Sequence, residues 1–240
     1  MSLVTKAPVY EIFFSFQGEG LYTGLPQVFL RFAGCNLKCR YCDTSYSTVI
    51  SKKAKYLSSD EILKKIYSVY TKNKSTFNRL DIDKPSISIT GGEPLIYVDF
   101  LKELLPKICE KGFSVYLETN GTLPKNLKEV IAFCDVVSMD FKFTSECGKT
   151  FWTEHRKFLK IAKNKVFVKC VITKNTKLQE IKKSAELIKS ISKNISLILQ
   201  LSIDKNIPDI QDLYKFYSQA RKVYPNIYLM VQMHKVYKVK

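Results

Sequence analysis

Residues 32–44 read FAGCNLKCRYCDT and hold three of the seven cysteines, with the spacing Cys-x3-Cys-x2-Cys. The stretch follows an apolar run and begins at a glycine, so we expect a compact loop at the end of a strand. Such a loop can gather Cys35, Cys39 and Cys42 around one iron–sulfur cluster, because thiolates are its preferred ligands. Structural zinc usually has four protein ligands, whereas three leave one iron of a cubane open. The alternative is three buried or zinc-bound cysteines.

Composition favours a globular protein of a reducing compartment. The 240 residues are 45% hydrophobic and 25% charged, which is ordinary for a globular domain. The cysteines are clustered and odd in number, unlike a secreted disulfide scaffold. No apolar run approaches the roughly 18 residues of a membrane helix, and the N-terminus lacks a secretory pattern. We therefore predict a cytoplasmic location without membrane association.

Strand-like and helix-like segments alternate along the chain, which predicts parallel strands with helical crossovers. The strand-like runs are 27–33, 86–90, 113–118, 135–140, 166–173, 196–201 and 227–231. The first helical stretch begins at Ser59. Further helical stretches cover 99–111, 125–133, 148–162, 178–192 and 210–223. The expected fold is α/β, a partial or open (β/α) barrel with about six to seven mainly parallel strands. The sequence predicts a single domain over 1–240, with its active site at the carboxyl ends of the strands.

Unusual residues follow these strands. Gly91 and Gly92 end the second run and would let backbone approach a ligand closely. Glu118 and Asn120 end the third, where a carboxylate and an amide can bind hydroxyl groups. In each case the alternative is an ordinary turn.

Two strands carry polar residues that need partners. Ser138, Asp140 and Lys142 share one face of their strand, and an internal Asp140–Lys142 pair is the alternative to ligand contact. Arg31 lies within the apolar run VFLRF, where an unpaired charge costs several kcal/mol. Its planar guanidinium suits a carboxylate, so an internal acid and an acidic substrate are equally compatible with the sequence.

The cysteine loop and the GGE turn at 91–93 resemble the radical S-adenosylmethionine (SAM) superfamily. The resemblance implies a [4Fe–4S] cluster on the three cysteines, with SAM on the open iron. It also implies that the chemistry is carried by cluster and SAM rather than by a catalytic side chain. The SAM-binding residues that it suggests are Tyr41, Cys42, Asp43, Gly91, Gly92, Glu93, Glu118, Asn120, Ser138, Asp140, Lys142 and Gln200.

The order of further motifs is similar to the 7-carboxy-7-deazaguanine synthase family. These are QGEG at 17–20, the strand arginine, the cysteine loop followed by Asp-Thr, TGGEP at 90–94, ETNGT at 118–122 and QMHK at 232–235. The resemblance implies ring contraction of 6-carboxy-5,6,7,8-tetrahydropterin to 7-carboxy-7-deazaguanine with loss of ammonia, in queuosine and 7-deazapurine biosynthesis. The implied substrate-binding residues are Phe16, Gln17, Gly18, Glu19, Arg31, Thr90 and His234.

The same resemblance implies Mg²⁺ on Thr44, with Asp43 as the rival ligand. It further implies an external one-electron reductant of the flavodoxin or ferredoxin type and a homodimer. A cluster loop at about 34–50 and a C-terminal segment at about 226–240 that caps the substrate complete the expected domain. Where family members have proline and small hydroxyl residues after Lys142, this chain reads FTSEC, which puts the local SAM contacts in question.

Two other functions remain as alternatives. A glycyl-radical-enzyme activase shares the cysteine loop and GGEP turn. Its substrate is a loop of another protein, however, so it needs no charged residue such as Arg31 to bind a small acid. An iron–sulfur RNA-binding protein would use the formal net charge of +17, yet the lysines are spread over predicted helices, which disfavours nucleic acid binding. We expect His155 to be structural or at the surface, and the four dispersed cysteines to form no second cluster.

Overall fold

The computed structural model describes residues 5–203 and 207–237, which form one nine-stranded sheet in the order β3-β1-β2-β4-β5-β6-β7-β8-β9. From β2 to β9 every neighbouring pair is parallel, whereas β1 pairs with β2 and β3 antiparallel. The strands are β1 (Ala7–Phe16), β2 (Pro26–Phe32), β3 (Lys55–Leu57), β4 (Ser86–Gly91), β5 (Val115–Thr119), β6 (Val136–Asp140), β7 (Val166–Ile172), β8 (Leu197–Leu201) and β9 (Ile227–Val231).

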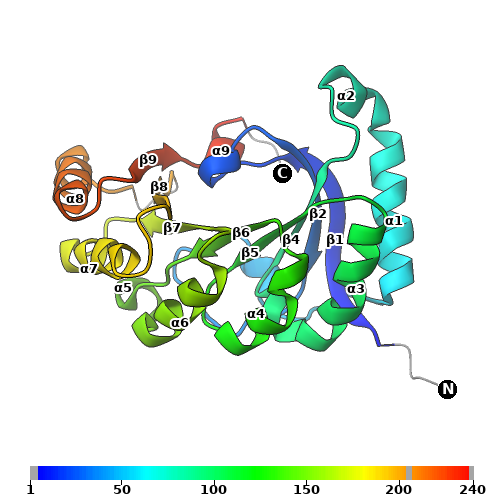
Figure 1. Ribbon diagram of the computed structural model, residues 1–240, viewed down its shortest axis with the longest axis horizontal. Helices are drawn as coiled ribbons and strands as arrows, with labels where there is room; N and C mark the ends of the chain where they lie inside the picture. Colours follow the sequence, from blue (N-terminus) through cyan, green and yellow to red (C-terminus); the bar gives the residue numbers. More distant parts are fainter. Residues whose placement is uncertain (1–4, 204–206, 238–240) are drawn as a thin grey trace.

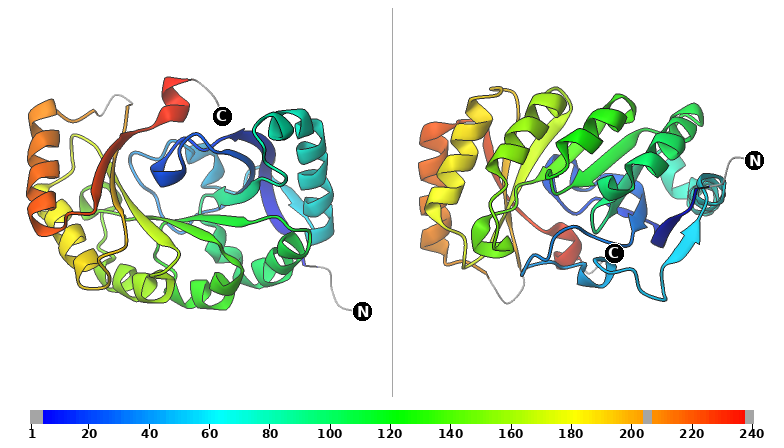
Figure 2. Two further views of the ribbon diagram at one scale, coloured as in Figure 1. Left: turned by 45° about the horizontal axis from the view of Figure 1, so that its top comes forward. Right: turned by 90° about the horizontal axis from the view of Figure 1, so that it is seen from below.

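Helices cover the outer face of the sheet, which curves into an open arc (Figures 1 and 2). They are α1 (Ser59–Lys72), α2 (Lys74–Arg79), α3 (Val98–Glu110), α4 (Pro124–Val130), α5 (Thr144–Cys147), α6 (Trp152–Ala162), α7 (Leu178–Lys189), α8 (Ile210–Val223) and α9 (Met233–Val236). Ser58 and Glu61 form a capping box that begins α1. The helices pack their apolar sides on the strands and form one continuous core.

The predicted open α/β barrel is confirmed, and the seven expected strands correspond to β2 and β4–β9. The expected count of six to seven was too low, because β1 and β3 also join the sheet. Half of β1 is only partly buried, and its buried and exposed positions do not alternate, so its pattern gave no strand signal. Helices α2, α5 and α9 were also not predicted, since each is six residues long or shorter.

The connection from β1 to β2 lies across the inner face of the arc (Figure 2, left). Within it, the backbone N–H of Gly20 donates to the side chain of Gln200 on β8 at 3.0 Å. The N–H of Met233 on α9 donates to the Gly18 carbonyl at 2.9 Å. The β1–β2 connection and the segment at α9 therefore meet over the inner face and narrow its opening. Among the described residues, no helix is long and apolar enough to cross a membrane.

Candidate active site

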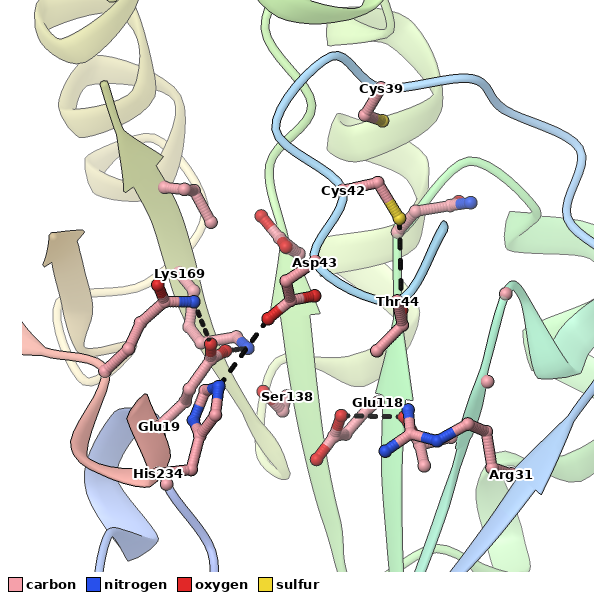
Figure 3. Close-up of a pocket in the computed structure, with 18 of the residues that line it drawn as sticks. Glu19, Arg31, Cys39, Cys42, Asp43, Thr44, Glu118, Ser138, Lys169 and His234 are labelled. Carbon is pink, nitrogen blue, oxygen red and sulfur yellow. Dashed lines mark hydrogen bonds and ion pairs between the residues drawn. The ribbon is translucent and has the colours of Figure 1, made fainter. Parts of the chain in front are cut away.

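The inner face of the arc holds a cavity of about 350 Å³ at the carboxyl ends of the parallel strands. Figure 3 shows its walls: Cys39 and Cys42 lie on the loop after β2, Glu19, Lys169 and His234 on one side, and Arg31 and Glu118 on the other. All the predicted cluster, magnesium and substrate residues line it. Of the predicted SAM residues, all but Glu93 and Gln200 do so.

Backbone hydrogen bonds shape the cysteine loop. The N–H of Gly34 donates to Ser47 at 2.8 Å, and the N–H of Cys35 donates to Thr48 at 3.0 Å. From the other side, Asn36 donates through its side-chain amide to Thr122 and accepts from Asn120, both at 2.9 Å. The turn after β5 therefore positions the start of the loop.

The glycine pair on β4 packs against the same loop. The N–H of Glu93 donates to the Gly34 carbonyl at 3.0 Å, and a Cβ on Gly92 would overlap that carbonyl oxygen. Glycine is therefore required at position 92 because backbone approaches it closely, as the sequence suggested. The group that approaches is the cysteine loop, whereas the sequence predicted a ligand.

Glu93 is fully buried behind the cavity wall. Its carboxylate accepts from the N–H of Leu95 at 3.0 Å, the Thr119 hydroxyl at 2.9 Å and the N–H of Asn120 at 2.7 Å. Burial raises its pKa to about 7, against the opposing effect of these donors. Glu93 therefore links the turns that follow β4 and β5. A direct contact of Glu93 with SAM stays a prediction.

The polar face of β6 opens into the cavity as its alternation predicted. Lys142 donates to Asp140 at 2.7 Å and to the hydroxyl of Tyr41 at 3.0 Å. The internal Asp140–Lys142 pair is therefore present, and it lines the cavity as well. It connects the aromatic residue of the cysteine loop to β6.

Glu118 lies with the predicted substrate residues. Its carboxylate accepts from the side-chain amide of Gln17 at 2.9 Å, from Thr90 at 2.8 Å and from Ser88 at 3.2 Å. Gln17 also donates to Gln27 at 3.0 Å. Because β4 and β5 are adjacent, this network joins three elements across the floor of the cavity.

Arg31 pairs with an internal acid, which is one of the two alternatives that the sequence allowed. Its Nε donates to Glu11 at 3.0 Å, and its guanidinium lies 5.6 Å from the centre of the Phe13 ring. Both partners are on β1, which the sequence did not reveal as a strand. Arg31 still lines the cavity, so an internal acid and an acidic ligand are compatible with each other.

Lys169 on β7 is a cavity residue that sequence reasoning missed. It forms an ion pair with Glu19, and the two side chains are 7% and 16% exposed. Gln232 donates to the other oxygen of Glu19 at 2.6 Å. The sequence could have indicated this residue, because Lys169 lies inside the apolar run VFVKCVI. Burying its charge without a partner would cost free energy, by the same argument that applied to Arg31.

Asp43 and His234 face each other at the mouth of the cavity. His234 Nε2 lies 3.6 Å from Asp43, and Lys235 lies 3.9 Å from it. Burial raises the pKa of Asp43, but the hydrogen bond from His234 and the charge of Lys235 outweigh it, and the pKa falls to about 2. For His234 the effects have opposite signs. Burial lowers its pKa, but the contact with Asp43 raises it, and the pKa is raised on balance.

Three potential metal ligands meet there. Atoms of Glu19, Asp43 and His234 all lie within 4.8 Å of one another. Lys169 already binds Glu19, however, and Lys235 lies beside Asp43. Two ammonium groups so close to a cation would repel it, so this cluster is a poor cation site.

Comparison with known proteins agrees with this geometry. The radical SAM superfamily matches residues 30–217. The chain is 39% identical to 7-carboxy-7-deazaguanine synthase of Geobacter sulfurreducens, over 81% of each protein. It is 31% identical to the enzyme of the same name from Thermococcus kodakarensis, over 94% of this chain and 96% of that one. The chain belongs to the 7-carboxy-7-deazaguanine synthase family of radical SAM enzymes.

The fold is also similar to a solved structure of this family. The crystal structure of QueE from Escherichia coli superimposes with a TM-score of 0.61, covers 95% of both chains and is 22% identical. At this identity the match supports the open-barrel fold alone. The predicted family and its [4Fe–4S] and SAM cofactors are confirmed by the sequence comparisons.

The residues present fit these two cofactors. Cys35, Cys39 and Cys42 all line one cavity beside the glycine turn. On the inner face, buried Oδ1 of Asp140 and Oε1 of Gln232 have no hydrogen-bond partner within the described chain. Buried polar atoms normally have partners, so these oxygens are suited to donors on a polar ligand such as SAM or the substrate. Gln200 instead holds Gly20 from outside the cavity.

The remaining predictions have mixed outcomes. His155 is buried and stacks on Phe141 with ring centres 4.6 Å apart, which confirms a structural role. The expectation that the four other cysteines form no second cluster stays a prediction; Cys147 is distant from the cysteine loop in sequence, but its sulfur lies 3.0 Å from that of Cys39. Residues 238–240 of the predicted C-terminal cap lie outside the described residues.

Proposed function

We propose that this chain is a Mg²⁺-dependent 7-carboxy-7-deazaguanine synthase that contracts the ring of 6-carboxy-5,6,7,8-tetrahydropterin with loss of ammonia. The observation that carries the proposal is the composition of the cavity. A three-cysteine loop faces an inner wall that presents a partly buried arginine and two partly buried carboxylates, Glu118 on the side of Arg31 and Glu19 on the opposite side (Figure 3). That combination matches a ligand that carries both an acid and a ring rich in N–H donors.

Arg31 is the proposed partner of the substrate carboxylate. Its Nε is bonded to Glu11, which fixes the plane of the guanidinium. A fixed planar fork binds a carboxylate with two parallel hydrogen bonds. The Phe13 ring below it adds a cation–π contact and limits movement.

Glu118 and Glu19 are the proposed partners of the pterin ring. An amino-pyrimidinone edge offers adjacent N–H donors, and a carboxylate accepts two of them. Gln17 and Thr90 hold Glu118, whereas Lys169 and Gln232 hold Glu19. Each carboxylate is therefore kept in one orientation before substrate arrives, which lowers the entropic cost of binding. Gly18 lets His234 approach closely, because a Cβ there would overlap the imidazole.

Thr44 is the proposed Mg²⁺ ligand, supplemented by substrate oxygens and water. Its hydroxyl lies 3.9 Å from the Cys42 sulfur, so Thr44 would hold the cation beside the cysteine loop. Hydroxyl oxygen suits a hard cation that retains water. Asp43 is the weaker candidate, because its carboxylate is engaged with His234 and Lys235.

When bound, the cluster and SAM supply reductive cleavage and hydrogen abstraction. The chain's own contribution is to aim the substrate carbon and to exclude competing reactions. Tyr41 and Lys142 would contact SAM beside the cluster, while the β6 face and Asn120 would border its ribose. The substrate residues line the same cavity, on β1, β2, β4, β5, the β1–β2 connection and the C-terminal segment.

The partners in this proposal are a small pterin substrate, a flavodoxin- or ferredoxin-type reductant and a second copy of the chain. We also propose that 1–240 acts as a single domain, because all the strands belong to one sheet and the cavity is built on it. A reducing cytoplasm suits the three thiolate ligands.

The direct test is turnover after anaerobic reconstitution. The enzyme is incubated with dithionite, SAM, Mg²⁺ and 6-carboxytetrahydropterin, and mass spectrometry follows 7-carboxy-7-deazaguanine. We expect product from wild type and none from Cys42→Ala. Arg31→Gln should raise KM by about tenfold or more, corresponding to about 1.4 kcal/mol or more of lost binding. The exposed Arg156→Gln is the matched control and should leave KM unchanged.

Two results would count against the proposal. Deoxyadenosine without the deazaguanine product would keep the radical SAM chemistry and move the substrate towards a protein loop, as in glycyl-radical activases. An unchanged KM in Arg31→Gln, with normal product, would remove the carboxylate assignment while leaving the family intact.

A further inference from the structure

The cluster loop has a fourth sulfur beside it. Cys147, the last residue of α5, places its sulfur 3.0 Å from that of Cys39. In the described residues, 5–203 and 207–237, no other pair of cysteine sulfurs lies in hydrogen-bond contact. The other two cluster cysteines have different neighbours, since Cys35 accepts from the N–H of Leu37 and Cys42 lies beside Thr44.

The backbone holds these two segments together. The N–H of Arg40, next to Cys39, donates at 3.2 Å to the carbonyl of Glu146, next to Cys147. The short helix is itself anchored, because the Glu146 side chain accepts from Thr173 and Ser145 donates to Glu180 at 2.7 Å. The sulfur pair is therefore aligned by flanking contacts rather than by chance approach of two loose loops.

We propose that Cys39 and Cys147 form a reversible disulfide in the cluster-free enzyme, a redox modification site that withdraws one cluster ligand. A disulfide needs a sulfur–sulfur distance of about 2.05 Å, so the sulfurs must approach by roughly 1 Å. Both side chains are half-buried, so a small oxidant can reach them.

The chemistry balances with a peroxide as the two-electron oxidant. The Cys39 sulfur attacks one peroxide oxygen, the O–O bond breaks, and a sulfenic acid and water are formed. The Cys147 sulfur then attacks the sulfenic sulfur, and the second water leaves as the S–S bond forms. Two thiols lose two electrons and two protons, and hydrogen peroxide becomes two water molecules.

The consequence concerns the cluster rather than the ring contraction. With Cys39 in a disulfide, the loop retains two of its three ligands and cannot hold the cluster. The disulfide also stops oxidation at a reversible step, because a sulfenic acid without a nearby thiol proceeds to irreversible acids. A dithiol reductant would return Cys39 to the loop by thiol–disulfide exchange.

Trypsin can assign this bond without ambiguity. Cleavage after Lys38 and Arg40 leaves Cys39 in the dipeptide 39–40, while Cys147 lies in 143–149. Cys35 and Cys42 fall in separate peptides, 32–38 and 41–52. Every possible pairing among these four cysteines therefore gives a different linked mass.

The experiment uses the full chain, freed of iron by a chelator under anaerobic conditions and treated with one equivalent of hydrogen peroxide. After alkylation and digestion, we expect 39–40 linked to 143–149, and a free-thiol count lower by two than the seven present. Dithiothreitol should restore both thiols and the ability to take up iron and sulfide. Cluster-loaded enzyme should form the bond more slowly, because Cys39 is then bound to iron.

Cys147→Ser should abolish the linked peptide and leave Cys39 as a sulfenic acid, because one equivalent of peroxide supplies a single oxygen atom. Cys109→Ser is the matched control, since that half-buried thiol donates its hydrogen bond to the Phe133 carbonyl and lies away from the cluster loop, and the bond should still form. Linkage of Cys39 to Cys35 or Cys42, or alkylation of both Cys39 and Cys147 after peroxide, would overturn the proposal. No SAM or pterin enters this test, so its failure and that of the proposed reaction are distinguishable.

Discussion

Replacing Lys169 by methionine tests the buried ion pair that orients Glu19. The two side chains are 7% and 16% exposed, so solvent screens their charges little. Removing one partner of such a pair costs about 3–5 kcal/mol, because the remaining charge stays buried. Gln232 still donates to Glu19 at 2.6 Å, which places the expected loss near the lower end. For a chain of this length, the melting temperature should fall by about 6–12 °C.

The assay is urea unfolding of wild type and Lys169→Met at equal cluster loading. Lys102→Met is the matched control, because its ion pair with Glu129 is about half exposed and spans 3.5 Å. That control should cost at most about 1 kcal/mol. Adding Glu19→Gln to Lys169→Met should recover most of the loss. The reasoning is refuted if Lys169→Met is no less stable than Lys102→Met.

The same pair sets a pH dependence. Burial and the charge of Asp43 raise the pKa of Glu19, but the charge and hydrogen bond of Lys169 and the charge of His234 lower it on balance below its ordinary 4.5. A lowered carboxyl pKa stabilises the fold above pH 4.5, and this contribution is lost as the pH falls through the folded value. Without Lys169, burial dominates and the pKa rises above 4.5. The variant should then lose stability as the pH increases above that value, opposite to wild type.

Three further outcomes follow from other parts of the site. Burial lowers the pKa of His155 to about 3, so stability should fall by about 1.4 kcal/mol per unit as pH drops below 6.5; urea unfolding of His155→Phe, which keeps the stack on Phe141, should lose this slope. Gly92→Ala should reduce iron per chain after reconstitution, because its Cβ overlaps the Gly34 carbonyl; wild-type iron content with an unchanged circular dichroism spectrum would contradict this. Thr44→Val should raise the Mg²⁺ concentration for half-maximal turnover by about tenfold or more, a loss of about 1.4 kcal/mol or more, and an unchanged Mg²⁺ titration would exclude this hydroxyl as a ligand.

The sequence by itself determined what depends on local spacing. The gaps between Cys35, Cys39 and Cys42 define a three-ligand loop within one short segment, whatever the rest of the chain does. The glycine pair at 91–92 and the alternation along β6 likewise encode short-range geometry. Because parallel strands end at one edge of a sheet, these motifs could be assigned to a common site before any contact was known.

Tertiary structure decided which charges meet. Glu19 and Lys169 are separated by 150 residues, and Glu118 and Gln17 by 101, and no local pattern specifies such pairs. Their meeting depends on the register of the sheet and on the path of the β1–β2 connection across it. The contact between Cys39 and Cys147 has the same origin, because a four-residue helix after β6 carries too little periodicity to be foreseen. The spacing of residues in the sequence determines which side chains a segment presents. The packing of the sheet and its connections determines which of those side chains meet.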